Sequence, residues 1–496
     1  MSQEPKKVDR RNFIYAGLGA VALIAIGAAA YVAMNPPVVT QTSVITSTVP
    51  TTTVITQPTT TVVTTTVPTT SVITTTTATT VTTTSTFKRA EEIVIATHKS
   101  PWLNAFKALA EMYTKTTGTK ATLMAYNSTT ELQEKIFADA MAGAGVHDVI
   151  LLQYFSAPFL MKGNFLYRIL DLQPDFKLDP NVIVPNYCYW PPGSNKLEDL
   201  YALPFNANNG FVFYRGDIYK EEGWGPPETW EDLRTYAKKK HNPSNQFYGW
   251  IPRADQAWWE WYGCLRSFGG DYFVNWEKGD FTVRVNDQNA VESLEIWSDL
   301  AATYGPPSPA SVTLSDIISY MSSGKGLQTH CSFAAFSWFD DPLYSSVPMK
   351  IESCLVPKGT TPGSKPGAQE GGFTMAIPKG SKKVETAWDF MKFAISYDAQ
   401  LIFALNGAAT CRLDVLDNPS ITTNTKFRVF NTFKEALKNM FYFPAIPEMP
   451  EIQGSIMNPA LQDTITKKKT PKEALNEAAQ KIVNFLKEKG YKTGLV

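Results

Sequence analysis

The sequence predicts an α/β fold in two lobes, preceded by a segment of different character. The chain has 496 residues, and about 400 of them follow residue 90, which exceeds the size at which one hydrophobic core keeps growing. This part opens with strand and helix patterns in alternation, which is typical of a parallel sheet with helices on its faces. The residues before it are first apolar and then rich in threonine.

Composition excludes some classes of function. Lys+Arg and Asp+Glu both number 46, so no net charge draws the whole chain to nucleic acid or anionic lipid. Hydrophobic residues make up 44% of the chain, with 12 Trp and 21 Tyr, enough for a sizeable core and for exposed stacking surfaces. The five cysteines are scattered and contain no C-x-x-C pair, so a disulfide scaffold is not expected and their pairing is left open.

The N-terminus predicts a membrane anchor. Residues 13–34 are uncharged and apolar, long enough to cross a bilayer as a helix. Residues 1–12 form a basic segment that contains Lys6, Lys7, Arg10 and Arg11. Because positive charge stays on the cytoplasmic side, we expect the rest of the chain to face the exterior.

The same segment resembles an export signal. Residues 9–14 (DRRNFI) are similar to a twin-arginine signal, although Asp9 stands where Ser or Thr is usual. Alternatively, the four positive residues before the apolar stretch only set the orientation of the helix in the membrane. Residues 28–30 (AAA) offer a cleavage site, so a removed signal and a retained anchor are both open. We expect retention because of the segment that follows.

Residues 35–89 predict a stalk. Threonine dominates them, with Pro50, Pro58 and Pro68 between, so no packing face forms and the backbone stays extended. About 50 such residues span on the order of 150 Å. Dense threonine is typical of O-glycosylation, and residues 127–129 (NST) add an N-glycosylation sequon. A stalk is useful to an anchored protein, which favours retention of residues 13–34.

The body begins with a β-α-β-α-β pattern. Strand patterns cover residues 92–96, 121–125 and 147–152, and helical spacing covers residues 102–114 and 130–141. Ligands of such sheets bind beyond the carboxyl ends of the strands. We therefore expect functional side chains in the residues that follow these strands.

Three stretches carry a family resemblance. Residues 201–205 (YALPF), 210–215 (GFVFYR) and 223–233 (GWGPPETWEDL) stand in an order and spacing that resemble the central signature of extracellular solute-binding proteins of the maltose-binding type, which deliver sugars to ABC transporters. Within the third stretch, Thr229 and Asp232 predict a capping box at the start of a helix.

The resemblance extends over residues 90–490. Further stretches that match in the family's order are residues 320–327 (YMSSGKGL), 371–378 (GGFTMAIP), 387–394 (AWDFMKFA), 444–449 (PAIPEM) and 471–475 (PKEAL). The resemblance implies a periplasmic-binding-protein-like fold, in which strands cross between two lobes and the ligand cleft closes by hinge motion. On this basis we expect lobe one at 90–207 and 357–417, and lobe two at 208–356 and 418–490.

A sugar site combines aromatic rings, which stack on C–H faces, with polar side chains that bind hydroxyl groups. Residues 258–262 (WWEWY) are the densest aromatic cluster, and their position resembles the family's sugar-stacking segment, with Trp259 best aligned and Trp258 beside it. At helical spacing we expect only some of these rings to face the ligand. Asn206 and Asn208 follow a strand, and Asn208 falls where the family commonly places a hydroxyl-binding residue; a simple turn is the alternative.

A second combination lies at residues 336–340 (FSWFD), where Trp338 and Asp340 repeat the pairing of a ring with a carboxylate. Core packing is the alternative for Trp338. Weaker ligand-binding candidates come from loops that the implied fold places at the cleft: Tyr154, Trp102, Gly372 and Arg412. Tyr154 is equally suited to cap the sheet, and Arg412 to pair with Asp414 or Asp417.

Enzyme chemistry finds little support, and we expect a protein without catalytic activity, cofactor or metal. A phosphate-binding loop that ends at Gly324-Lys325 requires Gly at the position of Ser319, so a nucleotide site is not expected. The G-x-S-x-G motif of serine hydrolases and the H-E-x-x-H motif of metalloproteases are absent. The four histidines are isolated from one another in the sequence. The main rival is a surface-anchored glycoside hydrolase that uses Glu260, Asp340 or Asp341. An envelope adhesin is the third class.

The predicted function is that of a surface-anchored receptor on the extracellular face of the cell membrane. It captures a sugar or oligosaccharide between two lobes and delivers it to an ABC transporter permease. Its expected partners are the carbohydrate, the permease subunits and, through the N-terminal helix, the membrane. The identity and linkage of the sugar are left open.

Overall fold

The computed structural model describes residues 51–62, 74–85 and 87–496. The predicted basic segment 1–12, the predicted anchor 13–34 and parts of the predicted stalk 35–89 lie outside these residues. Within the described ranges, no helix combines the length and apolarity that a membrane crossing needs.

Two strands precede the main body. β1 (Thr51–Val62) pairs antiparallel with β2 (Thr74–Ser85), in a unit that is separate from residues 89–496. No sequence pattern predicted this pairing, although Thr and Val favour strands. The stalk itself remains a prediction.

The first sheet of the main body has the strand order β4-β3-β5-β13-β6. β3 runs parallel to β4 and β5, whereas β13 is antiparallel to both of its neighbours. The strands are β3 (Glu92–His98), β4 (Lys120–Tyr126), β5 (Val149–Leu152), β6 (Leu203–Asn206) and β13 (Phe373–Ala376). α2 (Leu103–Thr117) and α3 (Thr129–Ala142) connect the parallel strands, so the predicted β-α-β-α-β alternation is confirmed.

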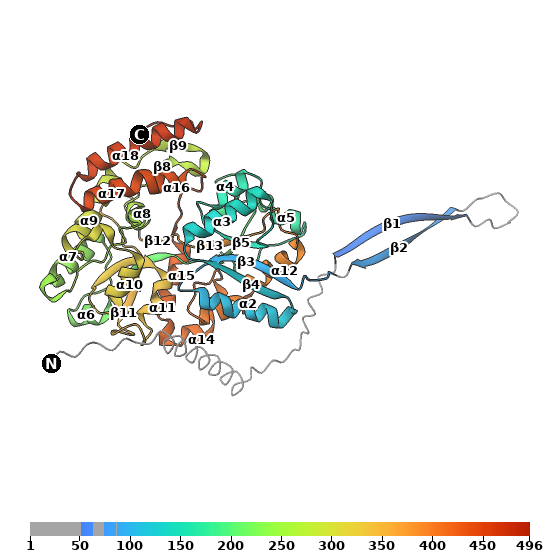
Figure 1. The fold of residues 1–496 in the computed structure, drawn as a ribbon, viewed down its shortest axis with the longest axis horizontal. Helices are drawn as coiled ribbons and strands as arrows, with labels where there is room; N and C mark the ends of the chain where they lie inside the picture. The colour runs from blue at the N-terminus through green and yellow to red at the C-terminus, as the bar shows by residue number, and fades with distance from the viewer. Residues whose placement is uncertain (1–50, 63–73, 86) are drawn as a thin grey trace, which may run out of the picture. The chain divides into compact units, whose positions relative to one another are not determined.

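The second sheet has the order β10-β7-β12-β14, with β11 also paired to β7. Its strands are β7 (Gly210–Arg215), β10 (Gln328–Ser332), β11 (Ile351–Cys354), β12 (Ala368–Gln369) and β14 (Met440–Phe441). A small hairpin, β8 (Phe273–Asn275) and β9 (Asp280–Val283), stands apart. The two main sheets form separate α/β layers with helices around them (Figure 1), which confirms the two-lobed fold.

Helices supply most of the remaining surface. They are α4 (Ala157–Lys162), α5 (Ile169–Leu172), α6 (Gly216–Glu221), α7 (Trp230–Lys240), α8 (Ala257–Ser267), α9 (Gln288–Tyr304), α10 (Leu314–Ser322), α11 (Phe336–Phe339), α12 (Val384–Ala394), α13 (Tyr397–Leu405), α14 (Pro419–Thr422), α15 (Val429–Lys438), α16 (Met449–Glu451), α17 (Asn458–Ile465) and α18 (Pro471–Glu488). A π-helical turn, Ile452–Met457, joins α16 to α17. The capping box predicted for α7 is confirmed, because Thr229 and Asp232 exchange hydrogen bonds of 3.1 and 2.9 Å.

The chain crosses between the sheets once more between β13 and β14, and before that at two short crossovers, residues 207–209 and 370–372. These crossovers touch: a Cβ added to Gly371 would lie 2.7 Å from the Asn208 carbonyl oxygen, and one added to Gly372 would lie 2.5 Å from that of Asn206. Only glycine permits such an approach of two backbones.

The predicted boundary at residue 357 precedes this second crossover. It rested on a stretch rich in Pro and Gly, but β12 still pairs with strands of the second sheet. The chain therefore changes sheets after Gln369.

Candidate ligand-binding site

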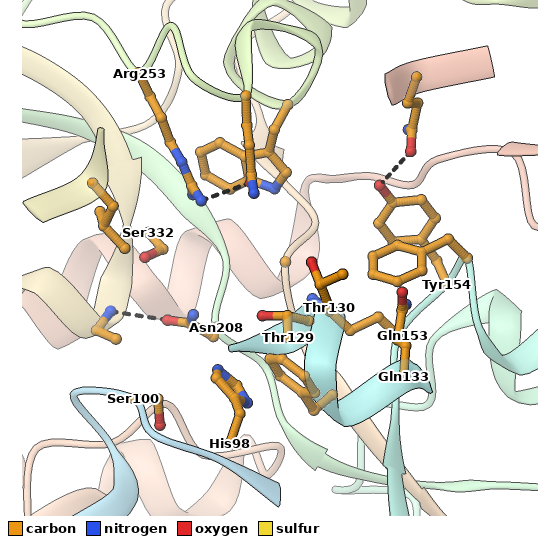
Figure 2. A pocket seen from close by; sticks show the side chains of 18 of the residues that line it. His98, Ser100, Thr129, Thr130, Gln133, Gln153, Tyr154, Asn208, Arg253 and Ser332 are labelled. Carbon is orange, nitrogen blue, oxygen red and sulfur yellow. Dashed lines mark hydrogen bonds between the residues drawn. The ribbon is translucent and has the colours of Figure 1, made fainter. Parts of the chain in front are cut away.

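A cavity of about 270 Å³ lies where β3 and β5 end. Both sheets contribute to its wall, as do α3, the loop before α8 and the π-helical turn (Figure 2). The lining residues are His98, Ser100, Pro101, Trp102, Thr129, Thr130, Gln133, Gln153, Tyr154, Phe155, Asn208, Arg253, Gln256, Trp258, Trp259, Leu314, Ser332, Ala334, Gly371, Phe373, Pro450, Gln453 and Gly454. Five predicted ligand-binding residues are among them: Trp102, Tyr154, Asn208, Trp258 and Trp259.

Two rings of the aromatic cluster line this cavity. Trp259 is 5% exposed and stacks on His330, with ring centroids 5.3 Å apart. The guanidinium of Arg253 lies 5.1 Å from the Trp259 ring centroid. Trp258 is half-buried, whereas Trp261 is fully buried and donates to Ser293. Helical geometry divides the cluster between the cavity and the core, as expected.

The Trp259 ring is held against backbone. A Cβ added to Gly210 would lie 2.4 Å from Cη2 of Trp259, and one added to Gly371 would lie 3.4 Å from Cζ2. The two glycines, one at the start of β7 and one in the second crossover, leave the space that the ring fills. The position of Trp259 therefore depends on the start of β7 and on the second crossover.

Trp102 and Tyr154 line the cavity just after the ends of β3 and β5. Trp102 is 2% exposed and meets His98 edge to face at 5.3 Å. Tyr154 stacks on Phe443 at 4.3 Å, and its hydroxyl donates to Gln453 Oε1 at 2.9 Å. Burial raises the pKa of Tyr154 well above its ordinary value, so this hydroxyl is a neutral donor.

Several polar groups in the cavity wall have no partner within the described part of the protein. They are His98 Nδ1, Ser100 Oγ, Gln133 Nε2, Arg253 Nε and Gln453 Nε2. Buried polar atoms without partners are costly and call for water or a ligand. Burial also lowers the pKa of His98 to about 4, so its imidazole is neutral near pH 7. The wall thus presents uncharged hydrogen-bonding groups and one guanidinium beside aromatic rings.

Asn206 and Gly372 do not line the cavity. Asn206 lies in β6 at 2% exposure, and neither atom of its side-chain amide has a hydrogen-bond partner among the described residues. The Gly372 backbone N–H donates to Glu370 Oε1 at 2.6 Å. Its neighbour Gly371 takes the lining position instead, because the crossover turns away after that residue.

Arg412 does not line the cavity. Its guanidinium forms ion pairs with Asp179 at 2.6 Å and Asp414 at 2.7 Å, and it donates to the Ile395 carbonyl at 3.1 Å. These hydrogen bonds raise the pKa of Arg412. Of the pairings left open by the sequence, the structure forms the one with Asp414.

Trp338 and Asp340 lie away from the cavity. Trp338 is 39% exposed and stacks on Tyr344 with centroids 6.2 Å apart. Asp340 is bound by Arg428 at 2.5 Å and accepts from the Met349 backbone N–H at 2.9 Å. The Trp338 ring on α11 is thus turned outward, while the Asp340 carboxylate is buried against Arg428; the repeated ring-and-carboxylate pattern did not reveal this.

The wall contains no carboxylate among its described residues. Glu260 is fully buried and accepts from the Arg253 backbone N–H, and burial raises its pKa to about 8. Glycosidases need a pair of carboxylates that flank the bond to be cleaved. Neither Glu260 nor Asp340 reaches this cavity, so the geometry disfavours the hydrolase alternative.

Within the described ranges, no three His, Cys, Asp or Glu side chains gather as metal ligands. The five cysteines, Cys188, Cys264, Cys331, Cys354 and Cys411, are free thiols.

Sequence reasoning missed Arg253, Gln256 and Gln453 as lining residues. His98 stands at a strand end, where functional residues were expected, but no motif in the sequence marked it as a binding residue. Arg253 and Gln256 carried no motif, although they lie just before the aromatic cluster. Gln453 reaches the cavity from a π-helical turn far along the chain, and such turns often occur at functional sites.

Comparisons with known proteins agree with this architecture. A mannitol-binding protein of Pseudomonas aeruginosa is 22% identical over 309 residues, which cover 62% of this chain and 69% of that protein. A solute-binding protein of Agrobacterium radiobacter K84, solved in complex with ribitol, superposes with a TM-score of 0.68 at 24% identity, covering 79% of this chain and 98% of that chain. A maltose-bound protein of T. maritima has a TM-score of 0.68 at 21% identity, covering 80% of this chain and all of that one. The family model for bacterial extracellular solute-binding proteins matches residues 97–401, and the chain therefore belongs to that family.

Proposed function

We propose that this protein is the receptor of an ABC transporter and that its cavity binds a sugar or a polyol. The observation that carries the proposal is the cavity wall, where Trp258 and Trp259 stand beside buried polar groups that lack partners among the described residues. Rings stack on the C–H faces of carbohydrates, and hydroxyl groups satisfy the unpartnered atoms. The relatives that bind mannitol, ribitol and maltose support this class of ligand.

Delivery to a permease is part of the proposal. The cavity lies beside both crossovers, so a rotation about residues 207–209 and 370–372 changes its opening. A ligand that contacts both lobes stabilises the closed arrangement, and a transporter can then distinguish loaded from empty receptor. Anchoring by residues 13–34, export by a twin-arginine route and a glycosylated stalk at residues 35–89 are further proposals, which rest on the sequence alone.

A thermal-shift panel tests the proposed function. The full-length protein is heated with mannitol, ribitol, maltose, longer oligosaccharides and sugar acids, each in excess. A ligand that binds only the folded state raises the midpoint by an amount that grows with its concentration. Saturable stabilisation by an unchanged sugar supports the receptor, whereas release of reducing ends from an oligosaccharide supports the hydrolase. The proposal fails if no sugar, polyol or sugar acid shifts the midpoint.

A further inference from the structure

Two side-chain amides in the cavity wall, those of Asn208 and Gln256, are oriented by hydrogen bonds to their oxygens. Asn208 Oδ1 accepts from the Ala334 backbone N–H at 2.9 Å. Gln256 Oε1 accepts from Arg253 Nη2 at 2.7 Å. Backbone N–H and guanidinium groups can only donate, so both amides are held with their oxygens engaged and their NH₂ groups left over.

Arg253 brings a positive charge to the wall, and its side chain points into the cavity (Figure 2). Its Nε atom is buried and has no hydrogen-bond partner in the described structure. Asp255 Oδ1 lies 3.7 Å from that atom, beyond hydrogen-bond range, and it too lacks a hydrogen-bond partner there. Asp255 thus forms an ion pair with Arg253, but among the residues that the structure describes no acidic side chain lines the cavity itself.

The N-terminus of α8 adds to the positive electrostatic potential that Arg253 creates in the cavity. Gln256 occupies the N-cap position without a side-chain capping bond, and Gln256, Trp258 and Trp259 all line the cavity. The first N–H groups of a helix carry a partial positive charge and favour an anion. Arg253 and this helix terminus come from one continuous segment.

Hydroxyl groups of the wall, among them those of Thr130 and Ser332, can both donate to and accept from the hydroxyl groups of a carbohydrate. A carboxylate only accepts, and guanidinium bonds to it are stronger than neutral ones. We infer that the ligand is a carbohydrate that bears a carboxylate, a uronic or aldonic acid, with that group against Arg253 and the amides of Gln256 and Asn208. This inference rests on the proposed function and narrows its class of ligand.

The test compares matched acid and neutral ligands by titration calorimetry on the full-length protein. The pairs are D-galacturonate with D-galactose, D-gluconate with D-glucitol, and α-1,4-digalacturonate with α-1,4-galactobiose. In at least one pair the acid should bind more than tenfold tighter, and the advantage should shrink between about 20 and about 300 mM NaCl, because salt screens the attraction.

Variants assign the preference to one side chain. Arg253→Gln should weaken binding of the acid at least tenfold and change the affinity for its neutral partner less than about threefold. Arg253→Lys should retain much of the preference for the acid. Arg168→Gln, at an exposed site, is the matched control and should bind like the unmodified protein. Thermal midpoints measured without ligand establish that each variant is folded. If a variant does not fold, the salt dependence measured on the unmodified protein still tests the inference.

Two results would overturn the inference. Equal or tighter binding of the neutral member in every pair would refute the acidic ligand and leave the proposed function intact. Absence of binding by both members of all pairs and by the wider panel would refute the proposed function, and the inference with it.

Discussion

Replacing Glu370 by glutamine should remove a pH dependence from the stability of the main body. Glu370 is fully buried in the second crossover. Its Oε1 accepts from the Tyr187 hydroxyl at 2.9 Å and from the Gly372 N–H at 2.6 Å, while Oε2 has no partner in the described residues. Burial raises the pKa of this carboxyl from 4.5 to about 7.

Proton linkage gives the sign and the size of the contribution that Glu370 makes to the free energy of unfolding. Because the pKa is higher in the folded state, folded protein keeps a proton that unfolded chain releases above pH 4.5. Its contribution to the free energy of unfolding is therefore full below pH 4.5 and declines until about pH 7. At about 1.4 kcal/mol for each pH unit, the loss amounts to about 3 kcal/mol.

Urea unfolding at several pH values measures this loss. The amide introduced by Glu370→Gln would keep Oε1 as acceptor for both donors and would not titrate. The free energy of unfolding of this variant minus that of the unmodified protein should therefore rise by about 3 kcal/mol from pH 4.5 to about pH 8. The titration of Glu260 cancels in this difference because both proteins contain it. Glu134→Gln, exposed on α3, should give a flat difference, and a flat result for Glu370→Gln, within about 0.5 kcal/mol, would refute the assignment.

Further substitutions test the site. Trp259→Ala should weaken ligand binding by about 2 kcal/mol, roughly 30-fold in Kd, the scale of a buried aromatic anchor; unchanged affinity by calorimetry would remove this ring from the site. Gly210→Ala should also weaken ligand binding, because its new Cβ would lie 2.4 Å from the Trp259 ring and displace it. The control Gly225→Ala, whose new Cβ meets no described atom within 4 Å, should bind the ligand normally. Equal Kd values for the two variants would contradict this packing of the ring. Trp338→Ala should leave Kd unchanged, since its ring faces outward against Tyr344, and a tenfold loss would place a ligand contact there.

Local patterns were sufficient for much of the fold. The β-α-β-α-β opening follows from hydrophobic spacing within each element, and Thr229 with Asp232 marked the start of α7 because a capping box involves only adjacent residues. The crossover at 370–372 was not visible in the sequence because β12 is too short to give a strand signal. Its membership of the second sheet depends on β7 and β14, which are distant in sequence.

The candidate site shows the same division. Trp258, Trp259 and Asn208 were selected by residue type and by their place in a family pattern, and all three line the cavity. Asp340 and Arg412 had suitable chemistry but form ion pairs with residues distant in the sequence, Arg428 and Asp179.

By itself, the sequence determined that this chain has an apolar and threonine-rich N-terminal part, an α/β body with family signatures, and an aromatic cluster suited to carbohydrates. Only the tertiary structure decided which side chains meet, since Arg253, His98 and Gln453 come from separate elements. Periodicity and capping act between neighbours along the chain. Whether a polar atom is paired or left facing a cavity is decided by contacts across hundreds of residues.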